Sequence, residues 1–394
     1  MRDRADLEQR RHLPLNAKIL MSQARIREWY NHWNGDVYVS FSGGKDSTVL
    51  AHLVRDLYPD VPLVFSNTGL EYLEIQSFAR KMGAEFIRPE MPFSEVISKY
   101  GYPIISKENA EAIYVARKIR SCSKWTNQKC QELNGERLKT PLPEPQTEEK
   151  MWQNWRRKAL MGEKEFSKEA KSIFNKEKWL PLARDTAFKI SHMCCNIMKK
   201  KPMHVYQKKS KRYPYIGTLT EESRLREQAW LKHGCNAFDT KNPSSQPMSF
   251  WTEQDVLNYV LLNNIEIASV YGNIISVDDQ GFEYEALPGM GCKLKCSGCD
   301  RTGCIFCGFA VHLEKGETRF QRLAKTHPRQ YEYCMMGGQW VDNPDYDPSA
   351  PKMDGDWVNW NPKRIWVPSK DGLGMKYVFD CCNELYGKDF IRYE

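Results

Sequence analysis

The sequence predicts an α/β protein with a doubly wound, mostly parallel sheet, and three observations support this fold class. An apolar run at Val37–Phe41 leads through a glycine-containing turn into a stretch with helical periodicity. A second apolar run at Val61–Phe65 precedes another periodic stretch at Leu70–Met82. A short run at Glu85–Arg88 continues this alternation of strand and helix, which is typical of parallel sheets with helices on both faces.

The length of 394 residues leaves room for two or three domains. The alternation of strand and helix stops near residue 107 and resumes after residue 185, which indicates an insertion. We predict four segments: the first part of the α/β domain at 1–106, a mostly helical, basic and Trp-rich insertion at 107–185, the second part of the α/β domain at 186–288, and a Cys-rich region with an irregular C-terminal lid at 289–394.

The composition is that of a globular protein with a moderate positive charge. Apolar residues make up 41% of the chain, and the formal net charge is +8. No apolar run approaches 18 residues, and no secretory leader is evident, so we expect a cytoplasmic protein without a membrane partner. The segment Lys199–Arg212 holds seven basic residues and no acidic one. Such a run is either a solvated face or a surface that attracts an anionic partner.

The turn after the first apolar run has the features of a phosphate-binding loop. It reads Ser42-Gly43-Gly44-Lys45-Asp46-Ser47. Two glycines let the backbone approach a ligand closely, and the N–H groups of the following helical turn favour an anion. Lys45 adds a positive charge, and Asp46 and Ser47 can cap the helix or hold Mg²⁺. An ordinary strand–turn–helix would not require Lys45 and Asp46 beside both glycines.

Two further elements are expected near this loop. Asn67, Thr68 and Gly69 follow the second strand, and the carboxyl ends of neighbouring parallel strands meet at one edge of a sheet. This turn is a candidate adenosine contact, although a simple Gly-containing turn explains its glycine equally well. Later in the chain, Tyr215–Leu219 is expected to be a further strand that enters a turn, and Glu221–Arg226 is expected to open the next helix. The candidate site residues here are Gly217, Glu222, Ser223 and Arg226. Helical spacing places Glu222 and Arg226 on one face, so Arg226 is a candidate ligand for a phosphate or sulfate group.

The strongest compositional signal is a cluster of five cysteines within sixteen residues. The five are Cys292, Cys296, Cys299, Cys304 and Cys307. The two Cys-x-x-Cys pairs lie closer together than the pairs of most zinc sites, so we favour an iron–sulfur cluster and keep zinc as the alternative. The distant pair Cys194–Cys195 adds two candidate ligands, and seven thiols therefore compete for about four bonds. Lys295 and Arg301 would offset thiolate charge.

Taken together, these motifs resemble the phosphoadenylyl-sulfate reductase family of the PP-loop ATP pyrophosphatase superfamily. The resemblance covers Asp36–Phe309 and includes the loop at Ser42–Ser47 and the sequence Gly303-Cys304-Ile305-Phe306-Cys307. It implies a PP-loop fold like that of the adenine-nucleotide α-hydrolases and binding of an adenine nucleotide. In adenylyl-sulfate reductases with a [4Fe–4S] cluster, a vicinal Cys pair and a later Cys-x-x-Cys hold the cluster, and these match Cys194, Cys195, Cys304 and Cys307. A local set of Cys296, Cys299, Cys304 and Cys307 is the alternative.

One departure from the family separates the functional hypotheses. Sulfonucleotide reductases carry a catalytic cysteine in a C-terminal Glu-Cys-Gly-Leu-His motif, which this sequence lacks. We therefore expect an enzyme that is similar to the sulfurtransferase of bacterial DNA phosphorothioation. It would cleave ATP to AMP and pyrophosphate and support sulfur transfer to an acceptor, for which a nucleic acid is a candidate. Its sulfur donor would be a protein such as a cysteine desulfurase.

Two alternatives remain open at this point. One is a reductase of PAPS or APS that uses another thiol, such as Cys334 or Cys381. The other is a non-catalytic subunit that senses nucleotide. The insertion contributes Trp152, Trp155 and Arg156–Lys158, which could stack on nucleic acid, although a packed helix is the better interpretation. The sequence does not indicate an oligomeric state.

Overall fold

The computed structural model describes residues 3–118, 160, 175–286, 293–348 and 360–394. The chain forms two compact units, of which the first comprises Met1–Glu90 and Met198–Cys304, and the second comprises Met91–Ile197 and Ile305–Glu394. Most of the predicted insertion at 107–185 lies outside the described residues, together with Trp152, Trp155 and Arg156–Lys158. Its helical character and the division into four segments therefore remain predictions.

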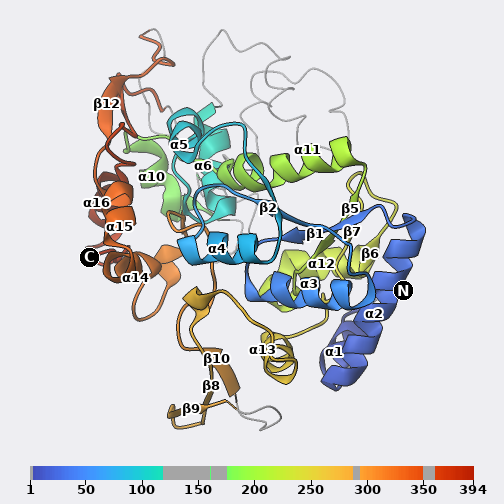
Figure 1. The fold of residues 1–394 in the computed structure, drawn as a ribbon. Helices are drawn as coiled ribbons and strands as arrows, with labels where there is room; N and C mark the ends of the chain where they lie inside the picture. The colour runs from blue at the N-terminus through green and yellow to red at the C-terminus, as the bar shows by residue number, and fades with distance from the viewer. Residues whose placement is uncertain (1–2, 119–159, 161–174, 287–292, 349–359) are drawn as a thin grey trace. The chain divides into compact units, whose positions relative to one another are not determined.

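A six-stranded sheet organises the first unit (Figure 1). Its strand order is β3-β2-β1-β5-β7-β6, and every pair is parallel except β6 with β7. The strands are β1 (Val37–Phe41), β2 (Leu63–Ser66), β3 (Glu85–Ile87), β5 (Tyr213–Ile216), β6 (Asn236–Ala237) and β7 (Ser244–Ser245). A mostly parallel sheet whose first strands are linked by helices confirms the predicted fold class.

Helices cover both faces of this sheet, as the apolar character of its strands requires. The helices of the first unit are α1 (Arg4–Arg11), α2 (Leu15–His32), α3 (Lys45–Leu57), α4 (Leu73–Lys81), α11 (Lys201–Ser210), α12 (Arg224–His233) and α13 (Glu253–Leu262), with short helical turns η4 (Thr220–Glu222) and η5 (Ser269–Tyr271). A π-helical turn, η3 (Asn196–Lys200), precedes α11. In Figure 1, α11 and α3 lie on opposite faces of the sheet.

The pleat of β1 explains this two-sided packing, because successive side chains point to opposite faces. Tyr38 is in a buried cluster with Val64 and with Tyr206 of α11. Val39 is paired in register with Tyr215, whose hydroxyl donates a hydrogen bond to the carbonyl oxygen of Ile26 in α2. One face of the sheet is therefore closed by α11, and the other by α2 together with α3.

A smaller antiparallel sheet in the first unit carries the beginning of the Cys-rich segment. Its order is β10-β8-β9, with β8 at Ile274–Val277, β9 at Glu283–Glu285 and β10 at Lys293–Cys296. Cys296 is therefore the last residue of a strand, opposite Ile274. Cys292 lies outside the described residues.

The second unit combines short helices with two small sheets. Its elements are α5 (Phe93–Tyr100), β4 (Ile104–Ile105), α6 (Lys107–Lys118), η2 (Glu177–Trp179), α10 (Leu180–Arg184), β11 (Gly308–Phe309), η6 (Val311–Leu313), α14 (Arg319–Thr326), α15 (Pro328–Met335), β12 (Gln339–Asp342), β13 (Arg364–Val367) and α16 (Met375–Tyr386). Within the described part of the C-terminal tail, the β12–β13 pair and the helix α16 are regular elements, and the role of this tail as a lid stays a prediction.

A buried arginine of α6 forms hydrogen bonds with the segment 182–188 of the second unit. The guanidinium of Arg117 donates hydrogen bonds to the carbonyl oxygens of Leu182, Ala183 and Phe188 and to the hydroxyl of Thr186. Backbone carbonyls at the end of a short helix need such donors when they are buried. Arg117 thus has a structural role in this unit.

Several predicted boundaries shift in the structure. The helix expected from Leu70 begins at Leu73, and the helix expected from Glu221 begins at Arg224. Ser223 has an extended backbone and caps that helix, since its hydroxyl accepts a hydrogen bond from the N–H of Arg226 at 3.3 Å. Among the described residues, no helix is both long and apolar enough to cross a membrane.

Candidate functional site

The loop between β1 and α3 has the tight geometry that its two glycines predict. Gly43 has φ +71°, and a Cβ at this position would lie 2.7 Å from Cγ2 of Ile75. Both the backbone conformation and the close approach therefore require glycine. Ser47 stabilises the turn, because its hydroxyl donates a hydrogen bond to the carbonyl oxygen of Gly44 at 2.9 Å and lies 3.0 Å from the hydroxyl of Ser42.

Lys45 is buried at the start of α3 and is held by groups from later parts of the chain. Its Nζ lies 2.7 Å from Oε1 of Glu253 and donates a hydrogen bond of 2.5 Å to the carbonyl oxygen of Asp300. It also lies 5.6 Å from the centroid of the Tyr271 ring. Burial acts to lower the pKa of Lys45, but the hydrogen bond to Glu253 and the charge of Asp46 outweigh it, and the pKa is raised. Lys45 is therefore a cation at neutral pH.

Asp46 presents a carboxylate oxygen that lacks a protein partner. Its Oδ1 is buried and has no hydrogen-bond partner among the described residues. Burial raises the pKa of the Asp46 carboxyl, and the charges of Lys45 and Arg301 oppose this shift only in part. A buried carboxylate oxygen without a donor fits a hard cation such as Mg²⁺, which prefers oxygen ligands. The residues present are thus compatible with the magnesium ion that the sequence predicts.

The end of β5 passes directly over this loop. Because β5 is the parallel neighbour of β1, the carboxyl ends of both strands meet at one edge of the sheet. A Cβ on Gly217 would lie 3.1 Å from the carbonyl oxygen of Asp46 and 3.2 Å from Cα of Ser47. Glycine at this position therefore allows close approach of two backbone segments, which the sequence alone did not indicate.

Two arginines converge on Glu222 beside Asp46. Arg226 forms an ion pair with Glu222, and Nη1 of Arg301 lies 3.6 Å from Oε1 of the same carboxylate. Burial lowers the pKa of Arg226, and the charge of Arg301 lowers it further, whereas Asp46 opposes the shift. Arg226 thus lies beside the loop, as the sequence predicted, but with Arg301 as a second cation.

The turn after β2 also lies at this edge of the sheet, because Phe65 of β2 is paired in register with Phe41 of β1. Asn67 accepts a hydrogen bond from the N–H of Gly69 through its side-chain oxygen at 3.1 Å. Gly69 has φ +75°, which favours glycine. Thr68 is buried and donates a 2.6 Å hydrogen bond to Glu71. The turn is rigid and is compatible with an adenosine contact, and its role stays a prediction.

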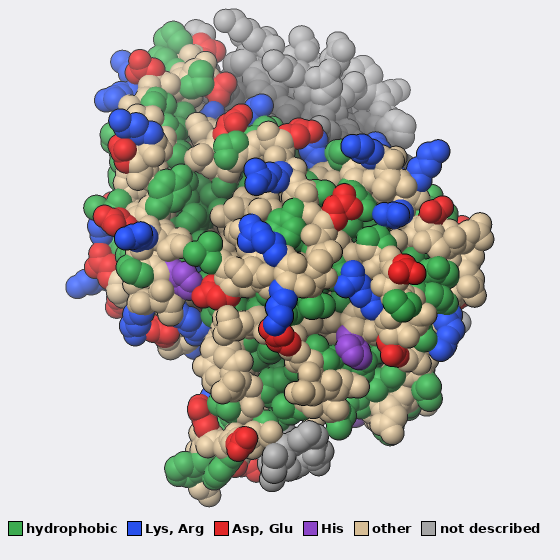
Figure 2. Space-filling model, viewed as in Figure 1, with side chains coloured by type: hydrophobic (Ala, Val, Ile, Leu, Met, Phe, Trp, Pro, Cys, Tyr) green, Lys and Arg blue, Asp and Glu red, His purple; other side chains and the backbone are tan. Residues whose placement is uncertain are grey.

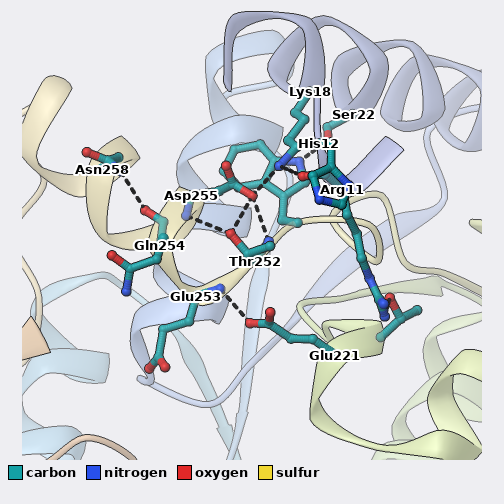
Figure 3. A network of polar contacts seen from close by, with 12 residues as sticks. Arg11, His12, Lys18, Ser22, Glu221, Thr252, Glu253, Gln254, Asp255 and Asn258 are labelled. Atoms are coloured by element: carbon teal, nitrogen blue, oxygen red, sulfur yellow. Dashed lines mark hydrogen bonds and ion pairs between the residues drawn. The ribbon is translucent and has the colours of Figure 1, made fainter. Parts of the chain in front are cut away.

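A polar network fixes the start of α13 (Figure 3). The side chain of Glu253, the first residue of this helix, pairs with Lys45. Thr252 and Asp255 form a capping box, and the Asp255 carboxylate also pairs with the buried Lys18 at 2.6 Å. The N–H of Glu253 donates a hydrogen bond of 2.5 Å to Glu221. Glu221 belongs to η4, as does Glu222, which pairs with Arg226. The network therefore connects Glu253, the partner of Lys45, with η4.

The Cys-rich segment folds back onto η5 and the phosphate-binding loop. The N–H of Gly298 donates to the carbonyl oxygen of Tyr271 at 2.9 Å, and the N–H of Cys299 donates to that of Val270 at 3.0 Å. The Tyr271 hydroxyl shares a 2.6 Å hydrogen bond with Thr302 and accepts one from the N–H of Lys45 at 3.3 Å. Residues 296–302, which we call the cysteine loop, are therefore bonded to the start of α3.

Comparison with known proteins identifies the family. The family model described as the phosphoadenosine phosphosulfate reductase domain matches residues 36–138 and 147–309, more than half of the chain. This chain belongs to the phosphoadenosine phosphosulfate reductase family.

The individual proteins that this chain resembles share little sequence identity with it. It is 29% identical over 103 residues to an adenosine 5′-phosphosulfate reductase of Staphylococcus haemolyticus (strain JCSC1435), a match that covers 24% of this chain and 42% of the relative. The chain thus matches less than half the length of this relative. A crystal structure of phosphoadenylyl-sulfate (PAPS) reductase from Candida auris, in a phosphate complex, aligns with TM-score 0.32 and 10% identity over 68% of this chain and 90% of that chain. The assignment to the reductase family rests on the family model.

The candidate metal ligands of this reductase-family chain are divided between the two units. Cys296, Cys299 and Cys304 belong to the first, and Cys194, Cys195 and Cys307 to the second. Within the part of the chain that the structure describes, no group of three or more His, Cys, Asp or Glu side chains is arranged to hold a metal ion. The ligand set therefore stays a prediction. Burial raises the pKa of Cys296, and the charge of Lys45 opposes this shift.

Sequence reasoning missed several residues of this site. Tyr271, Glu253, Asp300 and Thr302 all contact the start of α3 or each other, and none was assigned a role. They come from segments more than 200 residues after the loop. Position gave a partial signal only for Glu253, because the segment Ser249–Val256 has the sequence pattern of an N-capped helix start. The contacts of the other three depend on how the cysteine loop folds back.

Proposed function

We propose that this member of the phosphoadenosine phosphosulfate reductase family binds ATP, cleaves it at the α-phosphate to AMP and pyrophosphate, and supports iron–sulfur-dependent sulfur transfer to an acceptor. The observation that carries this proposal is the attachment of the cysteine loop to the phosphate-binding loop through Tyr271, Asp300 and Thr302. A sulfur-transfer enzyme needs thiol chemistry beside the activated phosphorus, and this arrangement brings Cys296 within electrostatic range of Lys45.

The loop at Ser42–Ser47 supplies the groups that an ATP pyrophosphate requires. The N–H groups at the start of α3 have no partner within the helix and favour an anion. Lys45 is a buried cation, and a phosphate oxygen would replace the carboxylate of Glu253 as its partner. Asp46 would hold Mg²⁺ through its buried Oδ1. The adenosine would contact the turn at Asn67–Gly69.

The reaction divides into two displacements, the first at the α-phosphorus of ATP and the second at the acceptor carbon that carries the adenylated oxygen. An oxygen of the acceptor attacks the α-phosphorus, and pyrophosphate leaves with the electron pair of the broken P–O bond. Lys45 and Arg226 stabilise the negative charge that develops. A sulfur nucleophile then attacks the adenylated carbon of the acceptor and displaces AMP. The acceptor proton passes to solvent in the first step.

The cysteines provide the donor set for an iron–sulfur cluster, and thiolates are the ligands that such clusters use. Two sets are proposed, one of Cys194, Cys195, Cys304 and Cys307, and the other of Cys296, Cys299, Cys304 and Cys307. A bound [4Fe–4S] cluster would supply sulfur or electron chemistry at this site. Zinc remains the alternative metal, because it also takes four thiolates.

A nucleic acid is the acceptor that the surface charge favours. Lys200, Lys201, Lys208, Lys209 and Lys211 are exposed on and beside α11. Figure 2 shows several Lys and Arg side chains over this part of the surface. Clustered cations of this kind attract a phosphate backbone. A sulfur donor such as a cysteine desulfurase would complete the system.

The direct test is release of pyrophosphate from ATP by anaerobically purified protein. We expect release that depends on Mg²⁺ and on a nucleic-acid acceptor, and Lys45→Ala should abolish it. Lys81→Ala, which removes an exposed lysine from α4, is the matched control. Iron, sulfide and zinc analysis of the same preparation identifies the metal. Zinc without sulfide would remove iron–sulfur chemistry from the proposal, and ATP binding without turnover would indicate a nucleotide-sensing subunit.

The relative's name favours a second candidate, a reductase that releases sulfite from APS or PAPS. This reaction needs a thiolate nucleophile. Burial raises the pKa of Cys334 well above its ordinary value, so that Cys334 is a poor nucleophile. Cys381 is only half-buried, although burial raises its pKa as well. Thiol-dependent sulfite release that is lost in Cys381→Ser, with no pyrophosphate release from ATP, would establish this second function.

A further inference from the structure

Arg301 occupies an unusual position in the cysteine loop. The residues on both sides of it are tied to the phosphate-binding loop, because the Asp300 carbonyl accepts a hydrogen bond from Lys45 and the Thr302 hydroxyl bonds to Tyr271. The backbone at Arg301 is therefore held in place. Its side chain is 62% exposed, and its distance of 3.6 Å to the Glu222 carboxylate is longer than a normal hydrogen bond. The guanidinium of Arg301 is thus held near Glu222 and still has N–H groups that can donate hydrogen bonds to a ligand.

The charges around Arg301 leave room for an anion. Arg226 and Arg301 share the carboxylate of Glu222, and two guanidinium groups beside one carboxylate repel each other. Arg301 lies near enough to lower the pKa of Arg226. Asp46, the other carboxylate close enough to attract Arg301, would coordinate the magnesium ion. An added oxyanion would relieve the repulsion, since a guanidinium presents a planar fork of donors that matches two oxygens of a tetrahedral group.

We infer that Arg301 binds the reacting tetrahedral oxyanion of the nucleotide together with Arg226, so that the cysteine loop contributes directly to substrate binding. The oxyanion is the α-phosphoryl group of ATP or the sulfonyl group of a sulfonucleotide. This inference rests on the proposed function and deepens it. It replaces the role that the sequence suggested for Arg301, which was to offset the charge of neighbouring thiolates.

A consequence is that nucleotide binding and order of the cysteine loop depend on each other. A ligand that is held by Arg301 favours the loop conformation in which Lys45 and Tyr271 bond to it. Displacement of the loop, in turn, removes one cation from the ligand. Nucleotide binding would therefore stabilise the position of the Cys296 and Cys299 thiols near the reacting centre.

The test compares Arg301→Ala and Arg301→Lys with Arg25→Ala in the full-length, anaerobically purified protein. Arg25 is the matched control, because it is a half-exposed arginine of α2 that pairs with Glu28 and has no role in the candidate site. Calorimetry gives the Kd of ATP, APS, AMP, pyrophosphate and adenosine. Iron and sulfide content and the melting temperature are measured on each variant.

We expect Arg301→Ala to weaken binding of AMP and of ATP or APS by about 10- to 100-fold, the effect of losing charge-assisted hydrogen bonds. Arg301→Lys should be intermediate, because an ammonium group cannot form the paired hydrogen bonds. Arg301→Ala should bind adenosine and pyrophosphate as the wild type does, and Arg25→Ala should bind every ligand as the wild type does. If Arg301→Ala loses more affinity for ATP than for APS, the group that Arg301 binds is the α-phosphoryl group. If it loses more affinity for APS, the group is the sulfonyl group.

Unchanged affinity for AMP, ATP and APS in Arg301→Ala would overturn the inference. So would a loss of iron and sulfide at unchanged affinity, since this would return Arg301 to the role of offsetting thiolates. Equal weakening of adenosine would indicate a general distortion of the site and would also count against it. Failure of the wild type to bind any of these nucleotides would contradict the proposed function itself, and the two failures are therefore distinguishable.

Discussion

The ammonium group of Lys45 lies 2.7 Å from the carboxylate of Glu253, although 207 other residues separate the two in the chain. Lys45 is buried and Glu253 is half-exposed, so this carboxylate sits where an anionic ligand would approach the lysine. The start of the phosphate-binding helix is thus occupied by an anion of the protein itself. A phosphate must compete with Glu253 before it can bind Lys45.

The first prediction follows from this competition. Glu253→Gln should strengthen binding of pyrophosphate roughly two- to fivefold, the range expected for removal of a partly exposed ion-pair partner. Equilibrium binding of pyrophosphate measures the effect. Glu266→Gln, which removes an exposed carboxylate paired with Lys81, should leave the affinity unchanged. Weaker binding in Glu253→Gln would show that Glu253 assists the ligand or its metal instead.

The second prediction concerns the orphaned oxygen of Asp46. Asp46→Asn should reduce Mg²⁺-dependent pyrophosphate release by about 10²- to 10³-fold, because the variant loses the carboxylate that would hold the ion. Asp56→Asn, an exposed position on the same helix α3, is the control. Titration of activity with Mg²⁺ should show that excess metal partly rescues the variant. An Asp46→Asn variant with wild-type activity would exclude a metal role for this residue.

The third prediction tests the contact between Gly217 and the start of α3. Gly217→Ala places a Cβ 3.1 Å from the Asp46 carbonyl oxygen and should lower the free energy of unfolding by about 1–3 kcal/mol. Nucleotide binding should weaken as well, because the loop must shift. Gly303→Ala, where a Cβ meets no atom within 4 Å, should be tolerated. Chemical denaturation compares the two, and equal stabilities would contradict the close approach.

The fourth prediction is a pH dependence in the second unit. Burial and the charge of Lys178 lower the pKa of His312, whose ring stacks on Phe390. The unfolded chain therefore binds a proton below about pH 6.5 that the folded chain resists, and stability falls as the pH decreases through this range. His312→Phe should flatten this acid slope when melting temperature is measured between pH 5 and 8. An unchanged slope would assign the dependence to another group.

The sequence was sufficient to predict β1 and the tight glycine turn that follows it. β1 has the predicted bounds, because an apolar five-residue run has few alternatives between a polar turn and a glycine turn. Gly43 was identified as a tight turn, and its positive φ and its contact with Ile75 follow from local backbone geometry. The ion pair between Glu222 and Arg226 was also expected, but its geometry was not. Glu222 lies in η4, and the extended cap residue Ser223 separates it from α12, so the pair does not arise from helical spacing.

Boundaries and distant contacts were less predictable. The helix after η4 starts at Arg224 because Ser223 caps it, whereas the acidic residues before it had suggested an earlier start. In the C-terminal tail, the Trp, Gly and Pro content concealed the β12–β13 pair and the helix α16. Local propensity is weak in such segments, and packing decides where each helix begins.

By itself, the amino-acid sequence determined the fold class, the tight glycine turn after β1 and the presence of a thiol-rich segment, because these depend on periodicity and on residue types at short spacing. Only the tertiary structure decided that Glu253 neutralises Lys45, that Gly217 passes over Asp46, and that the cysteine loop bonds to Tyr271 and Lys45. These contacts join segments that are far apart in the chain. They form because buried charges and backbone groups need partners, and the sheet and its crossovers determine which partners are within reach.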